Sequence, residues 1–318
     1  MRILFWGTPT FAVPTLRALT EEGYDVVGVV TQPDRPAGRG RVLRASPVKE
    51  LALAEGIPVF TPDRPRGEAF MDQIRALEPD LSVVVAYGHI LVREVLDLPR
   101  LGSINVHASL LPALRGAAPI HWAIARGDVM SGVTVMRMVE GMDAGPVLYR
   151  VEEPIGPEET STELAARLSE LGAQALIEAL TLLAAGALTE QEQDHELATF
   201  APKVSRAAAR IDWTRAAREV ADHVRAMDEV PGAWTTLDGD PLKLFRPRLG
   251  VGDGGADGSG DHEPGAVIDV AGDPDRGLGV AAGDGVVWFD EVQPPGRRRM
   301  AAGAWLRGRS IAGGTRFE

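Results

Sequence analysis

The chain has 318 residues, of which 45% are hydrophobic and 25% charged, a composition typical of a soluble globular protein and a length sufficient for two domains. It contains no cysteine, which excludes disulfides, thiolate catalysis and cysteine-based zinc sites and is compatible with a reducing, cytoplasmic location. Its formal net charge is −12, which argues against a nucleic-acid partner unless the basic residues are gathered into local patches.

The N-terminal residues predict the opening of a doubly wound α/β fold. We expect a buried first strand over residues 2–6, a helix from near Pro14 to Gly23 and a second strand over residues 25–31. The first residues contain no apolar run long enough for a signal peptide or a membrane span. The turn after the first strand lacks the GxGxxG pattern, so a dinucleotide site has little support.

Residues 32–47 are expected to form a long irregular segment that is rich in arginine. Long loops without secondary structure are usually functional or disordered, and a generic arginine-rich loop is most simply a solvated surface loop. Only one acidic residue, Asp34, accompanies the basic side chains. The basic residues are Arg35, Arg39, Arg41 and Arg44.

The next elements extend the predicted sheet. Helices are expected over residues 48–55 and 67–77, with a short strand over residues 58–60 between them. The continuous apolar run at residues 81–88 is typical of a central parallel strand. Tyr87, at the carboxyl end of this run, could be either a core aromatic residue or a residue of the cleft.

Three polar residues at two neighbouring strand ends form a candidate catalytic site. Asn105 and His107 alternate along a strand that begins at Ser103, so they share one face at its carboxyl end, where open α/β sheets place their sites. A second strand over residues 132–138 is followed by Asp143, which lies in a glycine-flanked turn. Such a set can catalyse acyl transfer. The amide stabilises an oxyanion, the imidazole carries a proton and the carboxylate orients the imidazole.

Simpler interpretations of these residues stay open at this point. His107 alone could be a hydrogen-bonded core histidine, and Asn105 and Asp143 could be turn residues. The histidines at positions 89, 107 and 121 show neither H-x-x-x-H spacing nor a carboxylate-rich pattern, so we expect no metal site.

The C-terminal half predicts one long helix followed by a small β domain. A helix is expected over residues 160–185, capped by Thr160 or Ser161 with Glu163 in the capping position. After a helix over residues 214–226, short strands separated by Gly- and Asp-rich turns are typical of a small barrel. We therefore expect a catalytic domain over residues 1–189, a linker over residues 190–205 and a barrel over residues 206–318. A second basic group near the end consists of Arg297, Arg298 and Arg299.

Several motifs in order along the chain resemble the folate-dependent formyltransferases, and among them those that act on methionyl-tRNA. The motifs are NVHASLLPALRGAAP, GMDAGPV, TQPDRPAGRG, SPVK and ARIDW. The resemblance implies a Rossmann-like formyltransferase domain with a mostly parallel sheet, followed by an OB-like barrel that binds tRNA. It implies 10-formyltetrahydrofolate as the co-substrate and Asn105, His107 and Asp143 as the catalytic residues.

The resemblance also assigns binding residues. The backbone of the SLLP turn is expected to line the folate pocket together with Tyr87. That turn consists of Ser109, Leu110, Leu111 and Pro112. The segment of residues 32–47 is expected to contact the acceptor end of the tRNA, with Arg39 matching the key arginine of the motif. We expect the loop arginines and the group Arg297, Arg298 and Arg299 to contact tRNA phosphates, because the acidic residues gather elsewhere.

The resulting hypothesis is a monomeric cytoplasmic enzyme, not bound to membranes, that formylates initiator methionyl-tRNA for translation initiation. One alternative is a sugar N-formyltransferase with the same folate donor, which is not expected to carry the QPDRPAGRG segment in this form. Another is a carrier of folate or tRNA without turnover, against which the intact Asn105, His107 and Asp143 argue.

Overall fold

The computed structural model of the chain describes residues 1–37, 42–250, 262–268, 277–308, 311 and 315–318. The chain divides into two compact units. Unit 1 comprises residues 1–119, 131–154 and 165–201, and unit 2 comprises residues 120–130, 155–164 and 202–318. Two short segments from within the predicted catalytic domain, residues 120–130 and 155–164, are thus part of unit 2, which the sequence did not predict.

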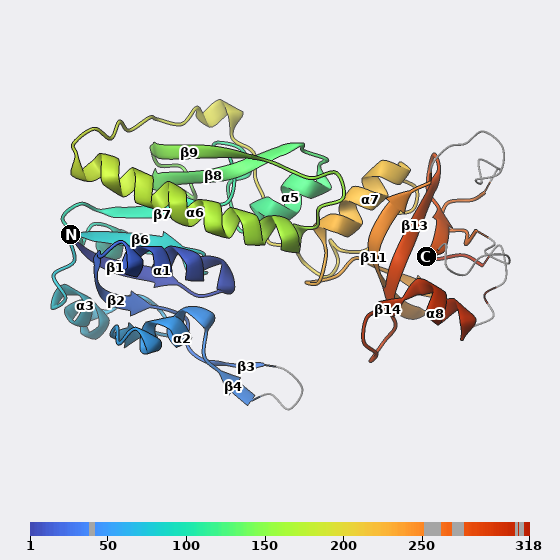
Figure 1. The fold of residues 1–318 in the computed structure, drawn as a ribbon, viewed down its shortest axis with the longest axis horizontal. Coiled ribbons are helices and arrows are strands. Elements are labelled where there is room, and N and C mark those ends of the chain that lie inside the picture. Colours follow the sequence, from blue (N-terminus) through green and yellow to red (C-terminus); the bar gives the residue numbers. More distant parts are fainter. Residues whose placement is uncertain (38–41, 251–261, 269–276, 309–310, 312–314) are drawn as a thin grey trace. The chain divides into compact units, whose positions relative to one another are not determined.

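Unit 1 is built on a seven-stranded sheet (Figure 1). In spatial order its strands are β5 (Val59–Phe60), β2 (Asp25–Val30), β1 (Arg2–Gly7), β6 (Leu81–Val85), β7 (Ser103–His107), β8 (Met130–Arg137) and β9 (Val147–Pro154). The strands from β5 to β7 pair in parallel, whereas β8 runs antiparallel to β7. This arrangement confirms the predicted α/β class with a mostly parallel sheet.

Helices cover both faces of this sheet. Leu4 and Trp6 of β1 pack with Phe70 and Ile74 of α3 (Glu68–Arg75), in a cluster that forms the core of one face. On the other face, Gly172 of α6 (Ser161–Ala184) lies directly against the valines of β7 and β8, where a Cβ atom would approach Val106 to 3.0 Å. The remaining helical segments of the unit are η1 (Thr10–Ala12), α1 (Val13–Glu21), α2 (Pro47–Ala54), α4 (Arg93–Leu96) and η2 (His195–Leu197).

The sequence predicted an irregular arginine-rich segment. The structure instead forms a small hairpin there. Its strands, β3 (Arg35–Ala37) and β4 (Val42–Arg44), pair antiparallel, with Arg35 opposite Arg44. Val42 has a strand-favouring β-branched side chain, but the prolines, glycines and arginines around it favour a loop in the sequence. The predicted tRNA contacts Arg39 and Arg41 lie outside the described residues.

Unit 2 combines helices with an antiparallel sheet. Its helices are α5 (Pro119–Ala125), α7 (Ala217–Ala226) and α8 (Ala302–Arg307). Its strands are β10 (Trp234–Leu237), β11 (Asp240–Leu249), β13 (Val286–Gln293) and β12 (Leu278–Ala281) in spatial order, with β14 (Met300–Ala301) paired to β13. In its core Trp213 stacks on Phe317 and donates a hydrogen bond to the hydroxyl of Thr235. The predicted class of a smaller β domain after the α/β domain is confirmed, although α8 and β14 of this unit, and β9 of unit 1, were not expected.

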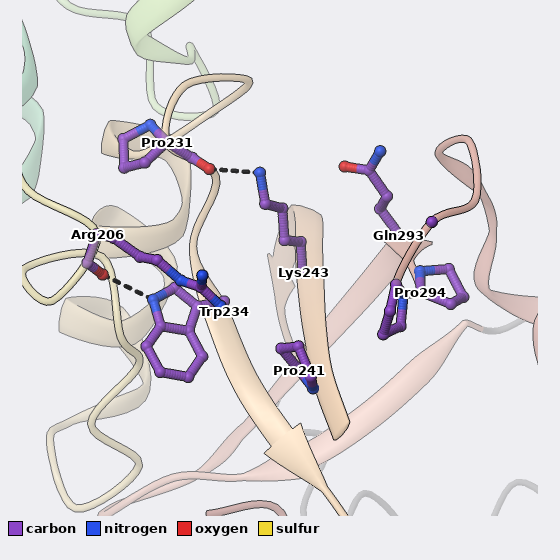
Figure 2. A pocket seen from close by; sticks show the side chains of 9 residues that line it. Arg206, Pro231, Trp234, Pro241, Lys243, Gln293 and Pro294 are labelled. Carbon is purple, nitrogen blue, oxygen red and sulfur yellow. Dashed lines mark hydrogen bonds between the residues drawn. The ribbon is translucent and has the colours of Figure 1, made fainter. Parts of the chain in front are cut away.

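A surface pocket of about 350 Å³ opens on the sheet of unit 2 (Figure 2). The guanidinium of Arg206 lies 5.3 Å from the ring centroid of Trp234, and the indole N–H of Trp234 donates to the backbone oxygen of Arg206. The ammonium of Lys243 donates to the backbone oxygen of Pro231. The pocket therefore combines one aromatic side chain with two cationic ones, and its rim reaches Gly296, next to Arg297.

Candidate active site

The candidate catalytic residues gather around the carboxyl end of β7, and because β8 runs antiparallel to β7, Asp143 reaches this end through the loop that follows β8. Asn105 pairs with Val84 of β6 and Met136 of β8, and His107 pairs with Thr134 of β8. Because side chains two residues apart point to the same face of a strand, Asn105 and His107 share one face. Both are buried, with exposed fractions of 9% and 6%, so the protein sets their positions.

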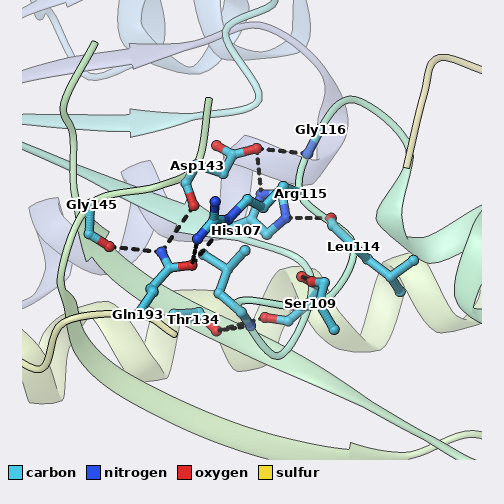
Figure 3. Close-up of polar contacts among 11 residues, drawn as sticks. His107, Ser109, Leu114, Arg115, Gly116, Thr134, Asp143, Gly145 and Gln193 are labelled. Carbon is cyan, nitrogen blue, oxygen red and sulfur yellow. Dashed lines mark hydrogen bonds and ion pairs between the residues drawn. The ribbon is translucent and has the colours of Figure 1, made fainter. Parts of the chain in front are cut away.

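His107 lies between two hydrogen-bond acceptors (Figure 3). Its Nε2 atom is 3.0 Å from the backbone oxygen of Leu114, and its Nδ1 atom is 3.7 Å from Oδ2 of Asp143. Since a carbonyl oxygen can only accept, Nε2 carries the hydrogen, and Nδ1 is the atom left to take up a proton. The carboxylate of Asp143 would then stabilise the charged ring.

The loop that holds His107 also holds Asp143. The backbone N–H of Gly116 donates to Oδ2 of Asp143 at 2.8 Å. Two residues before Gly116, the backbone oxygen of Leu114 accepts the hydrogen bond from Nε2 of His107. Gly116 has φ of +120°, and a Cβ atom there would come within 2.8 Å of the backbone oxygen of Ala201. A glycine is therefore required at this turn.

A buried hydrogen-bond network behind Asp143 was missed from the sequence. The guanidinium of Arg115 donates to Oε1 of Gln193 through Nε at 3.1 Å and Nη2 at 2.6 Å, and to Nδ1 of His195 at 3.0 Å. The amide nitrogen of Gln193 donates to the backbone oxygens of Asp143 at 2.9 Å and Gly145 at 2.7 Å. Arg115 and Gln193 are both 6% exposed. No local pattern links residues that lie 78 positions apart, so only the fold reveals this network.

The segment expected to be a linker contributes further to the site. The backbone N–H of Leu114 donates to the hydroxyl of Thr199, and the N–H of Arg115 donates to the backbone oxygen of Thr199. The N–H of Ala201 donates in turn to the backbone oxygen of Arg115. Residues 193–201 are therefore part of unit 1 and fix the loop that carries Leu114 and Gly116.

The SLLP turn is held firmly on β8. Thr134, which is fully buried, donates from Oγ1 to the backbone oxygen of Ser109 at 2.7 Å and accepts from the N–H of Leu111 at 3.1 Å. The hydroxyl of Ser109 donates to the backbone oxygen of Ala113, so it is engaged in the turn and is not presented as a nucleophile. The assignment of Ser109, Leu110, Leu111 and Pro112 to folate binding stays a prediction.

Tyr87 packs in the core. It is 2% exposed, and its ring meets the ring of Trp6 edge-on at 5.3 Å. Burial raises the pKa of Tyr87 to about 12, and its hydroxyl has no hydrogen-bond partner among the described residues. Of the two interpretations left open by the sequence, core packing accounts for these contacts, and a contact to folate stays a prediction.

The side-chain amide of Asn105 makes no hydrogen bond to any of the described residues. A nearly buried amide that the protein leaves unbonded can donate to an oxygen of a bound substrate. Asn105 and Nδ1 of His107 therefore offer a donor and a proton acceptor on one face of β7, the combination that acyl transfer to an amine needs.

The predicted RNA-contacting arginines differ in their surroundings. Arg35 and Arg44 are exposed on the hairpin, and Arg297 and Arg298 are exposed on unit 2. Arg299 instead forms ion pairs with Glu291 and Asp228 and lies 4.1 Å above the ring of Phe245. Arg299 thus has partners within the protein that the sequence did not reveal.

No group of three or more potential metal ligands occurs among the residues that the structure describes. In the same part of the chain, no helix is long and apolar enough to span a membrane.

Comparison with known proteins identifies both parts of the chain. Residues 1–180 match the family model described as formyl transferase, and residues 203–310 match the formyl transferase C-terminal domain. A methionyl-tRNA formyltransferase from Methylococcus capsulatus is 47% identical over 98% of this chain and 98% of its own length. One from Symbiobacterium thermophilum is 49% identical over 100% of this chain and 95% of its own length.

Solved structures share the fold at low sequence identity. HypX from Aquifex aeolicus, in complex with tetrahydrofolic acid, superposes with a TM-score of 0.65 at 21% identity over 96% of this chain and 47% of its own. An N-formyltransferase from Helicobacter canadensis, in complex with folinic acid and dTDP-3-aminofucose, gives a TM-score of 0.65 at 14% identity over 92% of this chain and 98% of its own. The chain therefore belongs to the formyl transferase family, alongside relatives that are named methionyl-tRNA formyltransferase.

Proposed function

We propose that this chain transfers the formyl group of 10-formyltetrahydrofolate to the α-amino group of methionyl-tRNA. The observation that carries the proposal is the unbonded amide of Asn105 beside the His107–Asp143 pair on one face of β7. The relatives named methionyl-tRNA formyltransferase, which match over nearly the full chain, support the choice of substrate.

The proposed mechanism passes through a tetrahedral intermediate. The amine nitrogen of the methionyl group attacks the formyl carbon, and the carbonyl electron pair moves onto the oxygen, where the amide of Asn105 donates a hydrogen bond. Nδ1 of His107 takes the proton released by the attacking nitrogen, and the carboxylate of Asp143 stabilises the charged ring. Collapse of the intermediate re-forms the carbonyl and breaks the bond to N10 of the folate, and N10 takes up the proton that His107 holds, which returns the imidazole to its neutral form. No covalent enzyme intermediate is needed, because the substrate amine is itself the nucleophile.

The folate donor is proposed to lie beside the SLLP turn. The two ligand complexes of the fold relatives, with tetrahydrofolic acid and with folinic acid, support a folate site in this fold. The bonds from Thr134 that fix the backbone of Ser109 and Leu111 provide a rigid wall for such a site.

The tRNA is proposed to contact basic residues in both units in spite of the net charge of −12. In unit 1 these are Arg35 and Arg44 of the hairpin, together with Arg39 and Arg41. In unit 2 they are Arg297 and Arg298, with the neighbouring pocket of Arg206, Trp234 and Lys243 as a further candidate surface. Arginines gathered in this way can neutralise phosphates locally.

The enzyme is proposed to act as a monomer in the cytoplasm. All three candidate catalytic residues come from one unit of one chain, and the absence of cysteine is compatible with a reducing compartment. Light scattering coupled to size-exclusion chromatography tests the monomer, since a mass of twice 33.9 kDa would contradict it.

The direct test is mass measurement of the amino acid on methionyl-tRNA after incubation with the enzyme and 10-formyltetrahydrofolate. We expect formylation of the α-amine, with more moles of product than moles of enzyme. Formylation of an amino sugar nucleotide instead would favour the sugar alternative, and binding of folate and tRNA without product would favour a carrier.

A further inference from the structure

We infer that Gln193 is the positioning residue that sets the carboxylate of Asp143 against His107. The inference rests on the proposed function and concerns a residue from the segment that the sequence assigned to a linker.

Among the described residues, Gln193 is the only side chain whose hydrogen bonds join Arg115 to the backbone of Asp143 and Gly145. Its Oε1 accepts twice from Arg115, and its Nε2 donates to the backbone oxygens of Asp143 and Gly145. These bonds fix the backbone of Asp143, while the N–H of Gly116 fixes its carboxylate.

The conformation of Asp143 shows why such support is needed. Its φ of +47° lies in the left-handed region, which residues other than glycine seldom adopt unless their surroundings impose it. The amide of Gln193 bonds to the carbonyl of this very residue and to that of Gly145. Without these bonds the loop could relax, and the distance of 3.7 Å between Asp143 and His107 would no longer be fixed.

The polarity of the amide distinguishes this role from simple packing. Only a side chain with both a donor and an acceptor can bind the carbonyls of Asp143 and Gly145 and also the guanidinium of Arg115. Gln193→Glu keeps the acceptor for Arg115 but faces the carbonyls with an oxygen. Gln193→Met keeps a similar volume and loses both functions.

We expect both variants to lower kcat by about tenfold to a hundredfold, because displacement of a catalytic group by about 1 Å has effects of this size. The KM values for folate and tRNA should change little, because Gln193 is only 6% exposed and its amide is engaged by Arg115 and the backbone. Gln191→Met, an identical substitution at an exposed position on the same segment, is the matched control and should retain wild-type activity. Should Gln193→Met fail to fold, Gln193→Glu carries the test, because it retains the pairing with Arg115.

A double-mutant cycle separates positioning from general stability. In an Asp143→Asn background, Gln193→Met should cause little further loss of kcat, because the group that it positions has already lost its function. A double variant whose loss of kcat equals the product of the two single losses would overturn the inference. Normal activity of Gln193→Glu would also overturn it, because it would show that only the contact with Arg115 matters.

A measurement without turnover keeps this inference distinct from the proposed function. The NMR ring resonances of His107 at one fixed pH, assigned with His107→Gln, should move in Gln193→Met toward their positions in Asp143→Asn. Unchanged resonances overturn the inference even where the wild-type enzyme formylates methionyl-tRNA. Resonances that move in a protein that does not formylate support the positioning role and reject the proposed function.

Discussion

Oδ2 of Asp143 lies 3.7 Å from Nδ1 of His107 and accepts the backbone N–H of Gly116 at 2.8 Å. The carboxylate is thus held by the backbone while its charge faces the imidazole. Asp143→Asn keeps an acceptor for Gly116 and removes the charge, so it should lower kcat/KM by about two to four orders of magnitude with little change in melting temperature. Steady-state formylation assays and thermal melts check this. Asp63→Asn, an exposed aspartate in the same unit, should behave as the wild type.

Asn105→Ala and His107→Ala should each lower kcat/KM by a similar two to four orders of magnitude, about the size expected for losing an oxyanion donor or a general base. If the three residues act as a unit, combining substitutions should cost much less than the product of the single effects. A His107→Ala protein that formylates at nearly the wild-type rate would rule out the mechanism.

The arginine hairpin gives a prediction about substrate discrimination. Arg35 and Arg44 face each other in the β3–β4 pairing and are exposed, so their joint replacement by alanine should raise the KM for methionyl-tRNA without changing the affinity for a folate analogue. If each contacts a phosphate, the slope of log affinity against log salt should flatten by up to about two units. Arg64 and Arg66, exposed in the same unit, form the matched control pair. Arg39→Ala should act in the same direction as the hairpin pair. Equal loss of tRNA and folate binding would contradict the assignment.

The sequence predicted those parts of the fold and site that depend on local patterns. The helix α6 begins where expected because Thr160 and Glu163 bond reciprocally through their side chains and backbone N–H groups. Asn105 and His107 could be placed on one face of a strand because the alternation of a strand is local.

What could not be predicted depends on contacts between distant segments. Gln193 reaches Arg115 across 78 residues, and nothing in the composition of residues 190–205 distinguishes it from a linker. The ion pair of Arg299 with Asp228 joins residues 71 apart, so three adjacent arginines looked equivalent in the sequence although their surroundings differ. Residues 120–130 and 155–164 belong to unit 2 because they pack there, which no local pattern encodes.

Two histidines of unit 2 predict a loss of stability in acid. Burial lowers the pKa of both His121 and His223 below the usual 6.5, and Nε2 of His223 is buried without a partner among the described residues. Since the unfolded chain binds protons more readily than the folded one, the free energy of unfolding should fall as the pH drops from 6.5 toward the lowered values. His121→Gln combined with His223→Gln should flatten this decline in melts between pH 7 and 5, while exposed His262→Gln should not. An unchanged pH profile in the double variant would show that other groups cause the decline.

The last prediction separates the three C-terminal arginines. Arg297 and Arg298 are exposed, so their joint replacement by alanine should leave the melting temperature unchanged and flatten the salt slope of tRNA binding by up to about two units if each meets a phosphate. Arg299 pairs with Asp228, whose side chain is only 7% exposed. Its replacement by alanine leaves that carboxylate without this partner and should lower the free energy of unfolding by about 1–3 kcal/mol.

The two phenotypes should therefore be opposite. Arg299→Ala should lower the melting temperature and keep the wild-type slope of log tRNA affinity against log salt. The double variant Arg297→Ala and Arg298→Ala should keep the melting temperature and flatten that slope. Arg299→Lys is the informative control, because lysine keeps the charge but lacks the planar fork that can bond Glu291 and Asp228 together. If Arg299→Lys melts early and binds tRNA normally, the role of Arg299 is structural. The opposite outcome is that Arg299→Ala flattens the slope as much as replacement of one exposed arginine does, at an unchanged melting temperature. In that case Arg299 binds a phosphate, and its ion pairs do not keep it from RNA.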